Sequence, residues 1–81
     1  MEENIINTIK EIITDKTGIE TDVLNPIMRI QEDLGIDKYD ITEISISIED
    51  KFSIQIDDDD VMKIKTIGEY INMVIREISK S

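Results

Sequence analysis

The sequence predicts an all-α fold, a small four-helix bundle of three longer helices and one short helix, with a long loop after the first helix. Three observations lead to this prediction. Apolar residues recur at the spacing of one helix face in three segments, capping residues precede two of these segments, and 81 residues are enough for one small domain. We therefore expect residues 1–81 to form a single domain.

The first helix is predicted to run from near the N-terminus to the glycine at position 18. Five isoleucines repeat here at i, i+1, i+4, i+7 and i+8, which places them on one face of a helix. They are Ile5, Ile6, Ile9, Ile12 and Ile13. Gly18 supplies a stop, because glycine readily adopts the left-handed conformation that ends many helices.

Residues 19–36 are predicted to form a long connection, since Pro26 and Gly35 interrupt any helical pattern. The stretch is nevertheless too apolar for a free linker, since it contains Ile19, Val23, Leu24, Ile27, Ile30 and Leu34. We expect this loop to pack back over the helix ends and to contain one short helical turn.

The second helix is predicted around residues 37–52. Ile41, Ile44, Ile48 and Phe52 fall within about 80° of arc at about 100° per residue, which outweighs the strand-like alternation of residues 44–48. On this helical phase, Ile46 points away from the apolar stripe and should be exposed to solvent.

Capping residues predict where the second helix and the later helices begin. Asp37 can cap the second helix, with Asp40 three residues later in a variant of the capping box. A short helix should follow the acidic run 57–60. Thr66 and Glu69 form a capping box for the last helix, whose apolar face repeats at helical spacing over residues 67–78.

Composition excludes several classes of function. With 19 acidic against 9 basic residues and a net charge of −10, the chain lacks the basic surface that nucleic acid or an anionic membrane requires. It has no Cys and no His, so thiol catalysis, zinc–thiolate sites and the commonest general base are missing. No apolar run approaches the length that would insert into a membrane. We expect a cytoplasmic monomer that is not an enzyme and holds no dedicated metal ion.

Several motifs then resemble the acyl carrier protein family. They are the string Glu32-Asp33-Leu34-Gly35-Ile36-Asp37, the acidic helix ending Glu49-Asp50-Lys51-Phe52, the Lys63-Ile64-Lys65-Thr66 step, and Tyr70-Ile71 in the last helix. The resemblance covers nearly the whole chain. It implies a four-helix bundle that shuttles acyl chains between enzymes of fatty-acid or related metabolism. It also implies 4′-phosphopantetheine attached to a Ser at the start of the second helix.

The sequence departs from the family at that attachment position. Where the family has Asp-Ser-Leu, this chain has Asp37-Lys38-Tyr39. A lysine ammonium has no hydroxyl and cannot form the phosphodiester. Two hypotheses remain: a natural carrier-like protein without the arm, or a carrier whose Ser was replaced on purpose. A chain without the arm could also act as a scaffold or regulator that occupies carrier-docking sites.

The resemblance further implies partner enzymes with basic docking patches. The outer face of the second helix and the start of the third would supply the contact, with acids that steer encounter and apolar groups that add contact area. The candidate partner-binding residues are Asp37, Tyr39, Asp40, Thr42, Glu43, Ile46, Glu49, Asp50 and Asp57. The acyl group and the pathway stay open at this point.

Overall fold

The computed structural model describes residues 2–80, which fold into four α-helices and one short 3-10 helix. They are α1 (Glu2–Thr17), η1 (Thr21–Val23), α2 (Lys38–Phe52), α3 (Asp58–Lys63) and α4 (Ile67–Lys80). Extended pairing within residues 2–80 is limited to one isolated bridge between Arg29 and Thr66. The predicted all-α bundle, with three longer helices, one short helix and a long first loop, is confirmed.

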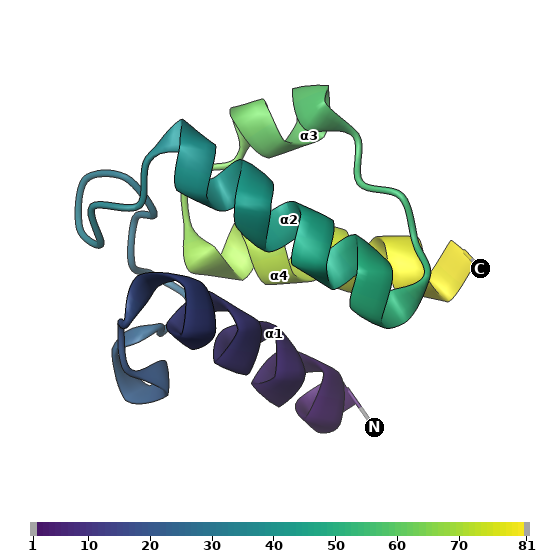
Figure 1. Ribbon diagram of the computed structural model, residues 1–81, viewed down its shortest axis with the longest axis horizontal. Coiled ribbons are helices and arrows are strands. Elements are labelled where there is room, and N and C mark those ends of the chain that lie inside the picture. Colours follow the sequence, from purple (N-terminus) through teal and green to yellow (C-terminus); the bar gives the residue numbers. More distant parts are fainter. Residues whose placement is uncertain (1, 81) are drawn as a thin grey trace.

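The helices pack with α1 against both α2 and α4. Figure 1 shows α1 and α2 running in opposite directions, whereas α4 runs in the same direction as α2. The short helix α3 runs back along α2, so its last turn comes near the start of α2. The loop between α1 and α2 covers the end of the bundle where α2 and α4 begin (Figure 1).

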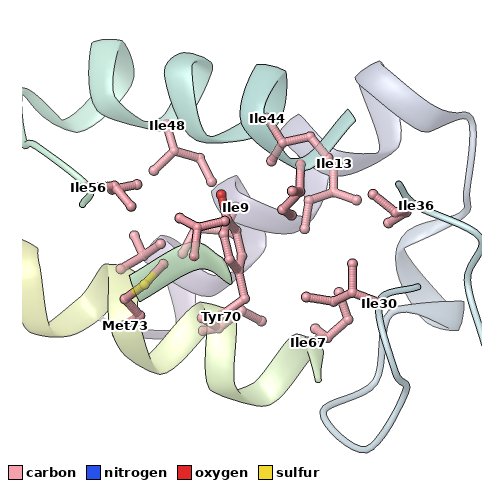
Figure 2. Close-up of a cluster of buried hydrophobic side chains, with 14 of the residues drawn as sticks. Ile9, Ile13, Ile30, Ile36, Ile44, Ile48, Ile56, Ile67, Tyr70 and Met73 are labelled. Atoms are coloured by element: carbon pink, nitrogen blue, oxygen red, sulfur yellow. The ribbon is translucent and has the colours of Figure 1, made fainter. Parts of the chain in front are cut away.

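Isoleucine builds most of the core. Figure 2 shows Ile44 and Ile48 of α2 facing Tyr70 and Met73 of α4, and all four are buried. Ile9 and Ile13 of α1 and Ile30 and Ile36 of the loop are likewise buried. Tertiary packing of these apolar faces therefore overrides the preference of isoleucine for strands.

The helix ends follow the predicted capping residues. Gly18 takes a φ of 79° and its N–H donates to the Thr14 carbonyl, as expected for a left-handed stop. Asp37 Oδ1 accepts from the Asp40 N–H at 2.8 Å, so the cap of α2 is confirmed. Within residues 2–80 the box there is only half formed, because the Asp40 carboxylate makes no return bond to the Asp37 N–H.

The capping box of α4 is complete. Thr66 Oγ1 accepts from the Glu69 N–H at 3.2 Å, and Glu69 Oε1 accepts from the N–H groups of Thr66 and Lys65 at 3.0 and 2.7 Å. These backbone hydrogen bonds lower the pKa of the Glu69 carboxyl. The carboxylate therefore satisfies two N–H groups at a helix start that would otherwise need water.

The long first loop packs back on the bundle, as predicted, and includes the short turn η1. Three backbone bonds join it to the start of α4: Ile30 N–H to Lys65 O, Ile67 N–H to Met28 O, and Gly68 N–H to Pro26 O, at 2.8, 2.9 and 3.0 Å. A Cβ at position 68 would lie 3.0 Å from the Pro26 carbonyl oxygen. Glycine therefore suits the close approach of the loop, because a larger residue would push Pro26 away by a few tenths of an ångström.

One polar pair lies inside the core between α2 and α4. The Ser45 hydroxyl and the Tyr70 hydroxyl are 2.7 Å apart, and Ser45 Oγ also donates to the Ile41 carbonyl at 2.8 Å. Burial raises the pKa of the Tyr70 phenol, so this group stays protonated. The pair ties the middle of α2 to α4 and was not foreseen from the sequence.

Candidate functional site

The turn before α2 sets the position of the candidate site. The Arg29 N–H donates to Asp33 Oδ2 at 2.8 Å, and the Arg29 guanidinium bonds both oxygens of the same carboxylate. These hydrogen bonds lower the pKa of the Asp33 carboxyl. Gly35 follows with a φ of 68°, which turns the chain so that Ile36 enters the core and Asp37 reaches the start of α2.

Lys38 is the first residue of α2, directly after the cap. Its side chain is exposed, and no carboxylate among residues 3–80 lies within 4.0 Å of its ammonium. The hydroxyl of Thr42, one turn later, donates to the Lys38 carbonyl at 2.8 Å. The start of α2 therefore presents a solvated cation.

A pocket of about 260 Å³ lies beside Lys38, between the start of α2, the end of α3 and the first loop. Its buried or half-buried apolar walls are Ile30, Ile36, Ile41, Val61 and Ile64. Its charged lining residues are Glu32, Asp37, Lys38 and Lys65, all of them exposed. Of these residues, only Ile41 was assigned to an apolar helix face from the sequence.

The outer face of α2 has the predicted mixture of polar and apolar groups. Ile46 is 47% exposed while Ile44 and Ile48 are fully buried, so the predicted helical phase is confirmed. Tyr39 is 73% exposed. Thr42 is also exposed, so the three lie on the solvent side of the helix.

The acids of the predicted docking surface differ in their exposure to solvent and in their hydrogen bonds. Asp50 and Asp57 are exposed, although Asp57 Oδ1 accepts from the Asp59 N–H and so caps α3. Glu43 and Asp40 are half-buried. Glu49 is half-buried as well, and its Oε2 accepts from the Ile56 N–H at 2.7 Å. The Glu49 carboxylate therefore holds the segment after α2 against the helix through this hydrogen bond. The sequence did not indicate this role.

The described residues were compared with the requirements for a metal cluster and for a membrane-spanning helix. Within residues 3–80 no three acidic side chains come close enough together to hold a metal ion. Over the same residues, no helix has the length and apolar character needed to cross a bilayer.

Comparison with known proteins agrees with this geometry. The profile of the PP-binding family, described as the phosphopantetheine attachment site, matches residues 7–74. The chain belongs to this family. The match spans all of the core elements, from the first turns of α1 to the middle of α4.

Two solved structures are similar over almost their whole length. The acyl carrier protein of Thermotoga maritima superposes with a TM-score of 0.82 at 25% identity, covering 98% of this chain and 92% of that one. The acyl carrier protein of Enterococcus faecalis gives a TM-score of 0.77 at 27% identity, with 95% and 98% covered. The chain therefore has the fold of an acyl carrier protein.

Family membership establishes the general role of the chain. Carrier domains of this family are not enzymes themselves, and the fold supports an acyl carrier role that involves interaction with enzymes of acyl metabolism. The family also implies binding of 4′-phosphopantetheine.

The residues at the start of α2 do not fit covalent attachment of that group. Lys38 offers an ammonium and no hydroxyl. The neighbouring Tyr39 offers a phenol that points to solvent, and the Thr42 hydroxyl is already bonded to the helix backbone.

Proposed function

We propose that this protein is a carrier-type module of fatty-acid or related acyl metabolism that presents its surface, and acyl groups, to enzymes without the prosthetic arm. The observation that supports this proposal is Lys38 as the first residue of α2, directly after the Asp37 cap. The rest of the carrier fold is retained around that position. The protein would work as a cytoplasmic monomer.

The chemistry at position 38 argues against the arm. Attachment requires a hydroxyl oxygen that becomes part of a phosphodiester, and the Lys38 side chain carries a nitrogen and no oxygen. Free N–H groups at a helix start favour an anion, but Lys38 puts a positive charge in that place. The site thus keeps its backbone geometry and loses its acceptor.

The docking surface is proposed to comprise the start and outer face of α2 and the start of α3. Its candidate residues are Asp37, Tyr39, Asp40, Thr42, Glu43, Ile46, Glu49, Asp50 and Asp57. A net charge of −10 would steer the chain toward enzymes with basic patches. The exposed side chains of Tyr39 and Ile46 would then supply apolar contact once the partner has docked.

Intact-mass spectrometry tests whether the arm is excluded. The chain is incubated with coenzyme A and a broad-specificity phosphopantetheinyl transferase, beside Lys38→Ser and Lys38→Ala. We expect the phosphopantetheine mass increase on Lys38→Ser alone, because only that variant restores a hydroxyl at the start of α2. The Lys38→Ala variant removes the positive charge without supplying an acceptor, and so separates the two effects of the substitution.

Each other outcome has a defined meaning. A mass increase on the unaltered chain would show that another residue accepts the arm, and the proposal would be wrong. If Lys38→Ser also stays unmodified, the transferase does not recognise this surface. A scaffold or regulator that occupies docking sites of carrier-dependent enzymes would then be the better account.

A further inference from the structure

Among residues 3–80, the exposed large apolar side chains fall into two groups. Tyr39, Ile46 and Met62 lie on α2 and α3, and the first two belong to the proposed docking surface. Val23 and Ile27 lie in the first loop and are 42% and 82% exposed. Single apolar side chains are common on protein surfaces, but two within five residues form a small patch. The first loop therefore carries an apolar patch of its own.

Ile27 lies near the tip of a β-turn formed by residues 25–28. The Met28 N–H donates to the Asn25 carbonyl at 3.1 Å, and Pro26 takes the second position, which its fixed φ suits. Ile27 does not have a positive φ, and a turn of this kind accepts most residue types at the third position. A polar residue would serve the turn equally well and leave no apolar group in water. The turn itself thus gives no reason for an isoleucine.

The backbone on both sides of Ile27 is anchored to the bundle. The Pro26 carbonyl accepts from the Gly68 N–H at 3.0 Å. The Met28 carbonyl accepts from the Ile67 N–H at 2.9 Å. An exposed side chain on an anchored backbone is already placed before a partner arrives, so less conformational freedom is lost on binding. The turn is therefore suited to present Ile27 to another protein.

The free charges around the turn are acidic. Residues 17–28 include Glu20 and Asp22 but no lysine or arginine. Both acids are exposed, and among residues 3–80 neither has a cation within 4.0 Å. The cation next to the turn, Arg29, already donates to both oxygens of the Asp33 carboxylate, at 3.2 and 3.0 Å. A basic surface would therefore complement this patch.

The turn belongs to the end of the bundle where α2 begins. Figure 1 shows the first loop at that end, beside the starts of α2 and α4. Ile30, two residues after the turn, and Lys38, the first residue of α2, line the same pocket. An enzyme that acts at the start of α2 would therefore come close to the turn as well as to the outer face of the helix.

We propose that the turn of residues 25–28 is a second docking element, which inserts Ile27 into a shallow apolar hollow of the enzyme that acts at the start of α2. Basic side chains at the edge of the hollow pair with Glu20 and Asp22, and Val23 packs at its rim. A contact away from α2 restricts rotation of the carrier about that helix, and so fixes how the start of α2 faces the enzyme. This inference rests on the proposed function only for the class of partner.

Nuclear magnetic resonance of the unaltered ¹⁵N-labelled chain tests the proposal, with the broad-specificity phosphopantetheinyl transferase as partner and without coenzyme A. We expect the amide signals of Val23, Ile27 and Met28 to shift or broaden together with those of Tyr39 and Ile46. Changes at Tyr39 and Ile46 alone would leave the proposed docking surface in place and overturn the second element. Changes at the turn alone would support the second element and contradict the surface on α2. If no signal changes, both contacts are wrong.

Calorimetry with the same transferase measures what the isoleucine contributes. Ile27→Asn should weaken binding about fivefold or more, as truncation of an interface anchor does. Ile27→Leu keeps an apolar group of the same volume and should bind within about twofold of the parent. Both variants should melt as the parent does, because the side chain is exposed and asparagine is common in turns.

A matched pair of variants tests the charges. Glu20→Gln should weaken binding about twofold, the range for exposed ion pairs, and the effect should shrink as salt is added. The Glu20 carboxylate makes no capping hydrogen bond to η1, so the variant leaves the loop unchanged. The control is Glu3→Gln, which removes the same charge from the start of α1, at the opposite end of the bundle (Figure 1).

Three further results would overturn the proposal. Equal affinity of the parent and Ile27→Asn would show that this side chain lies outside the interface. Equal weakening by Glu20→Gln and Glu3→Gln would reduce the charge effect to net charge. Shifts of the Val23 and Ile27 signals on dilution of the chain alone would assign the turn to a second copy of this protein. The mass-spectrometry experiment is independent of these results, because docking is measured without coenzyme A, so failure of either proposal can be recognised separately.

Discussion

For the buried hydroxyl pair of Ser45 and Tyr70, the loss of stability should depend on which of the two hydroxyls is removed. Ser45→Ala leaves the Tyr70 hydroxyl in the core without its partner, whereas Tyr70→Phe leaves the Ser45 hydroxyl still bonded to the Ile41 carbonyl. The phenol is fully buried and remains protonated, because burial raises its pKa. Removing the serine should therefore be the more costly change.

The magnitudes follow from the cost of an unpaired buried group. An orphaned hydroxyl costs about 1–3 kcal/mol, and an ordinary hydrogen bond contributes about 1 kcal/mol. Ser45→Ala should lower the free energy of unfolding by about 1–2 kcal/mol, since alanine recovers up to about 0.5 kcal/mol of helix propensity. Tyr70→Phe should cost about 1 kcal/mol. The double variant leaves no orphan and should cost about as much as Tyr70→Phe alone.

Urea unfolding followed by far-UV circular dichroism measures these differences. An 81-residue domain is expected to have a total stability of about 4–12 kcal/mol, so changes of this size are well resolved. The decisive quantity is the coupling energy of the double-mutant cycle, expected to be about 1 kcal/mol or more. If the two single costs simply add in the double variant, the hydroxyls do not depend on each other and the reasoning is refuted.

Two further predictions concern the helix phase of α2 and the cap of α4. Ile44→Ala and Ile48→Ala should each destabilise by about 2–4 kcal/mol, while Ile46→Ala should cost within about 0.5 kcal/mol yet slow transferase modification in the Lys38→Ser background. Equal destabilisation in urea titrations at all three positions would contradict the observed burial. The lowered pKa of Glu69 means that its carboxylate stabilises the fold above its ordinary pKa, and that this contribution is lost as pH falls through the lowered folded value. Glu69→Gln should therefore flatten the loss of stability on acidification, measured by thermal melts across the acidic range; an unchanged pH profile would rule out this role.

Features set by residues close in sequence could be predicted. The helical phase that exposes Ile46 follows from spacing alone, and the Thr66–Glu69 box follows from two residues three positions apart. The left-handed stop at Gly18 was likewise foreseen. In each case one helical turn contains all of the groups that interact, so no knowledge of the fold was needed.

Features that join distant segments could not be predicted in this way. Ser45 and its partner Tyr70 are 25 residues apart, and no local spacing indicates that their hydroxyls meet. Glu49 appeared as a free acid of the docking surface, but it bonds to Ile56 beyond the end of its helix. Such pairings depend on how the helices pack, and spacing within one segment contains no information about that.

The bonds between the first loop and α4 restrict where the chain can change in length. Loops of small domains usually tolerate insertions and deletions. Here the carbonyls of Pro26 and Met28 accept from the first N–H groups of α4, and Ile30 bonds in turn to Lys65. One residue added between positions 26 and 30 would shift the register of these hydrogen bonds and leave the N–H groups of Ile67 and Gly68 without acceptors. Length variation among proteins with this arrangement should therefore fall outside that five-residue stretch.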